Sequence, residues 1–142
     1  MVRAMTDLQR TLVLLKPDAV RRGLAGTILA RYEAKGLAVV AMELRHVDAQ
    51  MADRHYADHV EQPWYPPLRD YITGGPLVAL VLEGPSAVDV VRLMNGVTNS
   101  AAAAPGTIRG DFSLSNRENL VHASDSVESS SREVALWFPT LV

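Results

Sequence analysis

A single histidine, His122, has the strongest setting for chemistry in this sequence. It lies in the short apolar segment of residues 120–123, directly before Ser124-Asp125-Ser126, residue types that commonly begin a helix. The amino end of a helix attracts anions, and a neutral imidazole there can attack an electrophilic phosphorus atom. Its second ring nitrogen then needs an acceptor that fixes the tautomer, and Glu133 is a candidate for that role. A core histidine bonded to a backbone carbonyl is the alternative interpretation.

Two arginines and a threonine suggest a binding site for a polyphosphate. Arg109 lies in Gly106-Thr107-Ile108-Arg109-Gly110-Asp111, where glycines let the backbone approach a ligand and the guanidinium can bind phosphate through two contacts. Arg92 lies in an expected helix, and Thr98 follows near its end. Each charge-assisted contact is worth about 1.5–3 kcal/mol, whereas a surface ion pair contributes about 0–1 kcal/mol. Either arginine taken alone can be such a surface residue.

Lysine is rare in this chain, because its 14 basic residues comprise 12 Arg and only 2 Lys. Lys16 closes an apolar run at the expected end of a central strand, where a sheet opens onto a ligand crevice, although a strand-end lysine can also simply reach water. Lys35 is expected at a helix end, where its charge matches the dipole. Trp64 follows Pro63 in a proline-rich turn, where it could stack on a base or pack under its own loop.

The composition excludes several classes of protein. A chain of 142 residues fits one domain, which we expect to span residues 1–142. Without cysteine there is no disulfide framework, thiolate nucleophile or iron–sulfur cluster. The net charge of −2 argues against a general nucleic-acid binder or a protein of anionic membranes. Residues 1–7 lack the apolar segment of a secretory signal, and the longest apolar run is far short of the ~20 residues that span a bilayer, so we expect a cytoplasmic protein.

The elements that must position these residues alternate between strands and helices. Apolar runs predict strands over residues 11–15, 37–44, 77–82 and 120–123. Helical spacing predicts helices over residues 24–35 with Gly36 as the stop, from Asp48 to about His59, over residues 86–94 with Ser86 and Asp89 as a capping box, and after Ser126 with Val127, Val134, Trp137 and Phe138 facing the core.

Two segments are expected to lack regular structure. Residues 63–67 contain three prolines, and residues 95–112 form a long loop of the kind that tends to be functional. The order of elements is β-α-β, an extra helix, then β-α-β. This order predicts an α+β fold, the ferredoxin-like βαββαβ sandwich, in which helices pack on one face of a four-stranded, mostly antiparallel sheet.

Taken together, several segments resemble the nucleoside diphosphate kinase family. The matching segments are Lys16-Pro17-Asp18, His55-Tyr56, Gly74-Gly75-Pro76, Thr98-Asn99, residues 105–112, Asn119 with residues 122–129, and residues 133–138. The resemblance therefore covers nearly the whole chain, from about Thr11 to Phe138. The blocks over residues 105–112 and 122–129 are highly specific.

The resemblance implies transfer of the γ-phosphate of a nucleoside triphosphate, mainly ATP, to nucleoside diphosphates, which maintains the triphosphate pools. The route is ping-pong, through a phosphohistidine on His122 whose ring Glu133 orients. The implied catalytic residues are His122, Glu133, Lys16 and Tyr56, and the implied nucleotide-binding residues are Lys16, His59, Trp64, Leu68, Arg92, Thr98, Arg109, Asn116 and Asn119. Mg²⁺ would be bound by the phosphates of the nucleotide, and Asp125 would contact it through a water molecule. The family also implies a homo-oligomer, a tetramer or a hexamer, with neither membrane nor nucleic acid as primary partner.

The sequence departs from the family pattern at three places. Ser100 stands where proline is common, which predicts a loss of about 0.4–1 kcal/mol in loop or subunit stability. Ala123 replaces the usual glycine beside the nucleophile and would be strained if that position needs a positive φ. Asn116-Arg117-Glu118 makes the second wall of the base site more polar than usual.

Two other functions compete with an active kinase. A nucleotide-sensing or regulatory module could keep the fold without turnover, but it has no need of the nucleophile. A nucleic-acid binder of ferredoxin-like plan is disfavoured by the net charge of −2 and by the lack of paired sheet aromatics.

The two lysines give a first test. Lys16→Arg is expected to impair nucleotide binding or turnover, because a compact ammonium can reach between a ribose hydroxyl and a phosphate where a planar guanidinium fits poorly. Lys35→Arg is the matched control and should change neither. Steady-state kinetics and nucleotide binding measured side by side check this, and equal behaviour of the two variants would contradict it.

Overall fold

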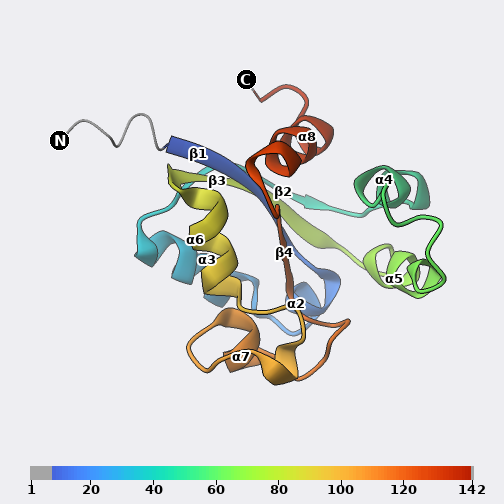
Figure 1. Ribbon diagram of the computed structural model, residues 1–142, viewed down its shortest axis with the longest axis horizontal. Coiled ribbons are helices and arrows are strands. Elements are labelled where there is room, and N and C mark those ends of the chain that lie inside the picture. The colour runs from blue at the N-terminus through green and yellow to red at the C-terminus, as the bar shows by residue number, and fades with distance from the viewer. Residues whose placement is uncertain (1–7, 142) are drawn as a thin grey trace.

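The computed structural model describes residues 8–141 and centres on a four-stranded sheet (Figure 1). Its strands are β1 (Leu8–Leu15), β2 (Ala38–Arg45), β3 (Leu77–Pro85) and β4 (Val121–Ala123), in the order β2-β3-β1-β4. All three neighbouring pairs are antiparallel, so the sheet is entirely rather than mostly so. The α+β, ferredoxin-like fold is confirmed. The prediction about a secretory signal concerns residues 1–7, which lie outside the described residues.

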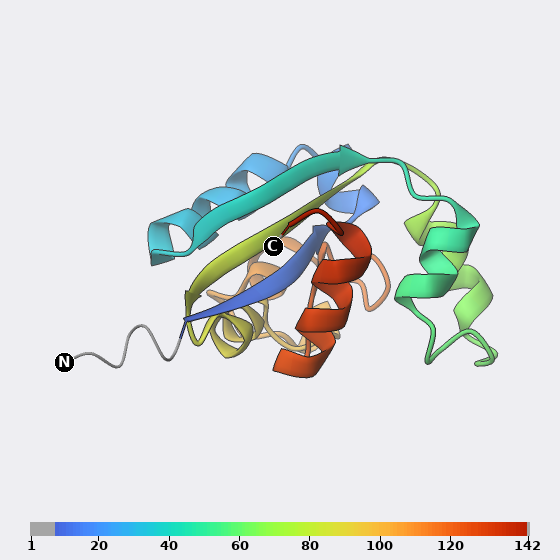
Figure 2. The ribbon, with the colours of Figure 1, turned by 90° about the horizontal axis from the view of Figure 1, so that it is seen from above.

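Residues 8–141 also form seven α-helices and one 3-10 helix, of which all but the last helix lie between strands in the sequence. They are α2 (Pro17–Arg21), α3 (Ala25–Lys35), α4 (Ala49–His55), α5 (Tyr65–Ile72), α6 (Ala87–Asn95), η1 (Ser100–Ala102), α7 (Ile108–Phe112) and α8 (Val127–Trp137). Figure 2 shows α4 and α5 side by side beyond one end of the sheet. Across residues 8–141, no helix combines the length and the apolar character needed to cross a membrane.

Helices cover both faces of the sheet, so the prediction of helices on one face is wrong. Val13 and Leu15 of β1 pack in a cluster with residues of α2, α3, α6 and α7. Leu12 and Leu14 pack in a second cluster with residues of α4, α5 and α8. The physical reason is visible in the strands themselves. Because β1 and β3 are apolar at consecutive rather than alternate positions, each of their faces must be buried.

The helices around the proline-rich turn differ from the prediction. Helix α4 ends at His55, with Tyr56 at its C-cap, rather than near His59. The expected break contains the start of α5, whose first turn holds Pro66. Proline fits there because the first N–H groups of a helix have no intrahelical partner and its fixed φ is already helical. The proline-rich segment of residues 63–67 is therefore in part a helix start rather than a break in regular structure.

Helix capping agrees with the sequence at some positions and not at others. Asp48 accepts a hydrogen bond from the N–H of Met51, and Ser126 caps α8. Ser86 makes no capping bond and has a left-handed backbone with φ 52°, so the predicted capping box does not form. Val127 is half exposed rather than in the core, and it belongs to neither apolar cluster.

The long loop of residues 95–112 contains η1 and α7, which the sequence did not predict. Thr107 caps α7 by accepting the N–H of Gly110. A Cβ at Gly110 would lie 1.9 Å from the carbonyl oxygen of Ala104, so this glycine is needed for packing within the loop. Gly106 has φ +96°, which favours glycine. Both glycines therefore serve the loop itself rather than the approach of a ligand.

The close packing of this loop predicts the effect of an added methyl group. Gly110→Ala is expected to destabilise the protein by about 1–3 kcal/mol, because backbone atoms must shift to admit the Cβ. Gly26→Ala is the matched control, since it lies in α3 with nothing within 4 Å of its Cβ and should be stabilising by about 0.5–1 kcal/mol. Urea unfolding of both variants checks this, and equal midpoints would contradict it.

Candidate active site

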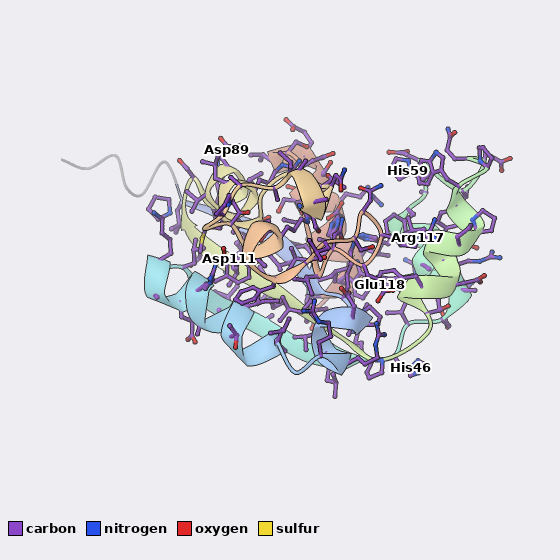
Figure 3. The ribbon with its side chains drawn as sticks, turned by 90° about the horizontal axis from the view of Figure 1, so that it is seen from below. His46, His59, Asp89, Asp111, Arg117 and Glu118 are labelled. Carbon is purple, nitrogen blue, oxygen red and sulfur yellow. The ribbon has the colours of Figure 1, made fainter. Side chains whose placement is uncertain are left out.

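One cavity of about 530 Å³ gathers every site residue that the sequence predicted. Its walls come from β4, α8, the end of β1, the α4–α5 pair and the segment that joins α6 to β4. The predicted residues that line it are Lys16, Tyr56, His59, Trp64, Leu68, Arg92, Thr98, Arg109, Asn116, Asn119, His122, Asp125 and Glu133. Figure 3 shows Arg117 on the main body and His59 on the α4–α5 side, at opposite walls of this cavity.

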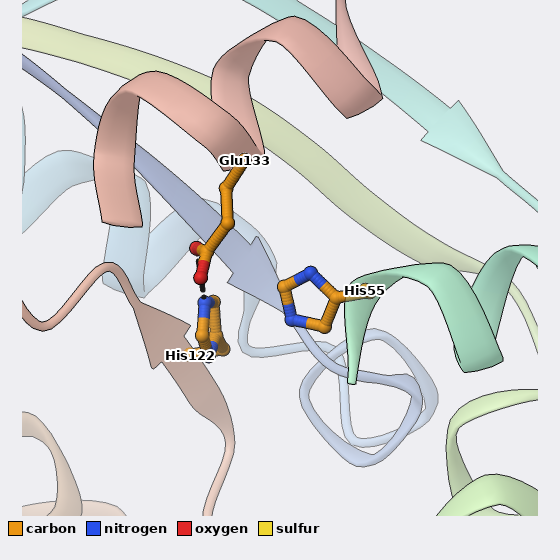
Figure 4. A group of neighbouring side chains, drawn as sticks. All are labelled: His55, His122 and Glu133. Atoms are coloured by element: carbon orange, nitrogen blue, oxygen red, sulfur yellow. Dashed lines mark hydrogen bonds and ion pairs between the residues drawn. The ribbon is translucent and has the colours of Figure 1, made fainter. Parts of the chain in front are cut away.

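The central contact of the cavity joins His122 of β4 to Glu133 of α8 (Figure 4). The His122 Nε2 atom lies 2.8 Å from Glu133 Oε1, and Ser124 Oγ donates to the same oxygen at 2.9 Å. A carboxylate acceptor places the proton of a neutral imidazole on Nε2, so Nδ1 carries the lone pair. Within residues 8–141, Nδ1 has no hydrogen-bond partner. The acceptor of the histidine is thus a carboxylate, not the backbone carbonyl of the alternative interpretation.

The segment before β4 is held by the end of β1. Leu120 has a positive φ of 74°, and its N–H donates to Asp18 Oδ2 at 3.1 Å. Its carbonyl accepts the backbone N–H of Lys16 at 2.8 Å. The side chain of Lys16 then donates from Nζ to Asn119 Oδ1 at 2.9 Å. Lys16-Pro17-Asp18 therefore sets the backbone that leads into His122.

The environment of Lys16 weakens its hold on a proton. The side chain is 7% exposed. Burial, followed by the positive charge of Arg109, lowers the pKa of Lys16 to about 8, and the negative charge of Asp18 offsets part of this. The ammonium is therefore charged at neutral pH and neutral in moderately alkaline solution.

The two arginines of the expected phosphate site differ in how firmly they are held. Arg109 is buried and donates to three carbonyl oxygens, those of Gly96, Asn119 and Val121, at 2.7, 3.2 and 2.7 Å. It therefore ties the loop to β4 and retains part of its five N–H groups for a ligand. Arg92 is exposed in the cavity and donates to the carbonyl oxygen of Ala123 at 3.5 Å. Among the ion pairs of the described residues 8–141, none involves either arginine.

Aromatic side chains line the wall formed by the α4–α5 pair. Tyr56 packs edge-on against Tyr65, and burial raises the pKa of its hydroxyl, which stays a phenol at neutral pH. Trp64 is 47% exposed, with its ring 5.2 Å from that of His59. Trp64 is therefore not buried under its own loop, and it offers an open ring surface to the cavity.

Sequence reasoning gave His55 no functional setting, yet the structure places it beside His122. Their ring centroids lie 4.6 Å apart, and Trp137 Nε1 donates to His55 Nδ1 at 3.0 Å. His55 precedes His122 by 67 positions, so periodicity could not bring the two together. The available signal was its membership of the matching pair His55-Tyr56.

Two features bear on metal binding. One ligand atom each from His55, His122 and Glu133 lies within 4.8 Å of the others. His122 Nε2 and Glu133 Oε1 are already in hydrogen-bond contact with each other, and cationic side chains line the same cavity, so we assign no metal to this group. Asp125 also lines the cavity, and the hydroxyl of Ser129 holds the pKa of its carboxyl below the usual value. Asp125 is therefore an ionised oxygen ligand of the kind that Mg²⁺ accepts.

Ala123 is not strained, because its position does not need the positive φ that would strain an alanine. The only non-glycine residues of the described chain with positive φ are Ser86 and Leu120. The position beside His122 is ordinary strand backbone, which alanine adopts freely.

A histidine with a carboxylate partner, facing cations in one cavity, is an arrangement suited to phosphate transfer. The family model described as nucleoside diphosphate kinase matches residues 9–141. The chain therefore belongs to the nucleoside diphosphate kinase family, and it transfers phosphate from nucleoside triphosphates to nucleoside diphosphates. This membership supports the kinase over the inactive sensing module and over the nucleic-acid binder.

Similar proteins agree along nearly the whole chain. The chain is 74% identical over 132 residues to a nucleoside diphosphate kinase from Nocardioides sp., covering 93% of this chain and 98% of the relative. It is 61% identical to that of Cutibacterium acnes, covering 97% and 100%. Among solved structures, the Halobacterium salinarum enzyme in complex with CDP has a TM-score of 0.89 and 44% identity, covering 92% of this chain and 87% of that one.

The pKa of Lys16 predicts how substrate affinity depends on pH. Because the pKa is lowered to about 8, most Lys16 side chains lose their charge between pH 7 and 9. If only the charged form binds nucleotide, the KM for nucleotide should rise by up to ~10-fold over that range. Lys16→Arg stays charged, so its KM should be higher at pH 7 but lack this rise. A flat KM in the unmodified enzyme would contradict the role of the ammonium.

Proposed function

We propose that the phosphate transfer proceeds through a phosphohistidine on His122. The observation that carries the proposal is the 2.8 Å contact from His122 Nε2 to Glu133, which leaves Nδ1 as the free nucleophilic nitrogen of a cavity-lining ring. In the first half-reaction, the Nδ1 lone pair forms a bond to the γ-phosphorus, and the bond to the bridging oxygen breaks. The nucleoside diphosphate leaves with the electron pair of the broken phosphorus–oxygen bond. An acceptor diphosphate then attacks the same phosphorus and releases Nδ1.

Glu133 stabilises the charge that this step creates. Phosphorylation of a neutral imidazole at Nδ1 while Nε2 keeps its proton gives the ring a positive charge, which an adjacent carboxylate favours. Glu133 is 6% exposed and is fixed by Ser124 as well as by His122. A carboxylate held in place before the reaction needs no reorganisation when the charge appears.

The remaining cavity residues divide by the part of the nucleotide that each would contact. Arg92, Arg109 and Thr98 would bind the phosphates, through guanidinium and hydroxyl donors. Lys16 and Asn119, already joined by a 2.9 Å hydrogen bond, would contact the ribose hydroxyls. The side chains proposed around the base are Trp64, Leu68 and Asn116, and those proposed near the transferred phosphate are Tyr56 and His59.

Mg²⁺ is the proposed metal. When bound, it neutralises charge on the phosphate oxygens of the nucleotide. The donor set fits a metal that the nucleotide carries, because the ionised Asp125 lines a cavity whose other charged walls are largely cationic. Asp125 would hold the ion through water.

We also propose that residues 1–142 form one kinase domain and that copies of the chain assemble into a tetramer or a hexamer in the cytoplasm. Large apolar side chains on the surface support assembly, notably Met42 and Leu44 on the edge strand β2, and Leu93 and Leu114 elsewhere. Neither a membrane nor a nucleic acid is proposed as primary partner, in keeping with the net charge of −2.

The phosphohistidine predicts a defined chemical behaviour. ATP radiolabelled on the γ-phosphate should transfer its label to the protein, giving an adduct that acid destroys and that GDP discharges as labelled GTP. His122→Ala should not be labelled. His46→Ala is the matched control, because His46 is exposed and does not line the cavity (Figure 3), and it should be labelled normally. Label that survives His122→Ala would overturn the proposal.

A further inference from the structure

A second histidine, which the proposed reaction leaves unused, is buried against the nucleophile. His55 is the last residue of α4 and is only 4% exposed. It lies between Trp137 at the end of α8 and His122 of β4, with ring contacts to both. A buried imidazole in contact with a reacting ring must have a defined proton arrangement, because each of its nitrogens is either a donor or an acceptor.

Trp137 fixes that proton arrangement. The indole Nε1–H can only donate, and it donates to His55 Nδ1 at 3.0 Å. Nδ1 of His55 must therefore carry a lone pair, which puts the proton on Nε2 and excludes the imidazolium. Burial, followed by the positive charge of a protonated His122, of Arg132, of Lys16 and of His59, lowers the pKa of His55 well below its usual value. The carboxylate of Glu133 faces the same group and is bonded to His122 and Ser124.

The two imidazole rings are arranged so that an edge of His55 faces the ring of His122. The ring centroids are 4.6 Å apart and the planes are inclined by 80°. Figure 4 shows an edge of His55 that carries a ring nitrogen turned toward the face of His122. With Nδ1 bonded to Trp137, that edge carries the Nε2–H. A polar N–H edge against an electron-rich aromatic face is an attractive arrangement.

The contact restrains a rotation that Glu133 cannot restrain. A single hydrogen bond at Nε2 fixes the position of that atom but leaves the plane of the His122 ring free to turn. The attacking lone pair of Nδ1 lies in that plane, so its direction depends on the rotation. Since in-line attack on phosphorus demands a defined direction, a packed edge on the ring face supplies the missing restraint.

We propose that His55, held as the neutral Nε2–H tautomer by Trp137, is a positioning residue that fixes the ring plane of His122 for attack on the γ-phosphate. The inference rests on the proposed role of His122 as the nucleophile. It assigns His55 no contact with substrate. The contacts run from Trp137 to His55, from His55 to His122, and from His122 to Glu133. They connect α4, α8 and β4, and both the first and the last residue belong to α8.

Two variants remove the restraint, and the stability of each is measured beside its rate. His55→Phe keeps an aromatic ring but removes both the acceptor and the N–H, and Trp137→Phe removes the donor that fixes the tautomer together with part of the buried indole volume. Each should lower the single-turnover rate of His122 phosphorylation by about 10- to 100-fold, with the Kd for ADP unchanged. His55→Gln can accept from Trp137 through its carbonyl and present an N–H, so its rate should lie within about threefold of the unmodified enzyme. His46→Phe is the matched control and should show no change.

Several outcomes would overturn the inference. One is a normal phosphorylation rate in folded His55→Phe or Trp137→Phe, and another is a slower rate matched by an equal loss of ADP affinity. A third outcome comes from nitrogen NMR of the unmodified enzyme, which should find His55 Nδ1 unprotonated at pH 6. A proton on Nδ1 would contradict the proposal, and this test does not depend on whether the variants fold. Absence of any phosphohistidine in the unmodified enzyme would instead refute the proposed function, and the NMR measurement would still test the tautomer.

Discussion

The site depends on how the chain is held at Leu120, one residue before β4. Leu120 is fully buried in a left-handed conformation that costs a non-glycine residue about 1–2 kcal/mol. Both of its backbone polar groups bond to the segment after β1, the N–H to Asp18 and the carbonyl to Lys16. Such strain persists only where the surroundings over-determine it. Here the surroundings are the end of a central strand, and the result is that Asn119 faces Lys16 while β4 enters the sheet with His122 opposite Leu14.

Several charged side chains of the cavity have two tasks. Arg109 bonds three backbone carbonyls across the loop and still faces the cavity. Lys16 is bonded to Asn119, and its burial lowers its pKa to about 8. Hydrogen bonds within the protein hold these cations in place before a ligand arrives. The side chains therefore lose less conformational entropy when the ligand binds. The cavity therefore concentrates positive charge in a chain whose net charge is only −2.

The α4–α5 pair and α8 complete the site from outside the central strands. Trp137 of α8 and His55 of α4 pack on the second face of the sheet, and the same helix α8 supplies Glu133 to His122. Helix α8 thus contacts His122 directly through Glu133. It also acts on His122 indirectly, because Trp137 holds His55 of α4 against the His122 ring. Covering both faces of the sheet is what allows this, because the apolar cluster on the second face anchors α4 and α8 beside the end of β4.

Residue types and short-range spacing alone predicted several candidate residues of the site, and the resemblance to the kinase family added others such as Tyr56, His59 and Leu68. His122 before a serine-rich helix start, Arg109 in its glycine-bounded segment and Lys16 at a strand end were all predicted, and all line one cavity. The tertiary structure alone decided what depends on long-range contacts. It placed helices on both faces, ended α4 at His55 and brought that residue against His122. Periodicity reports one element at a time, whereas the meeting of elements distant in sequence depends on how two apolar faces of one sheet are covered.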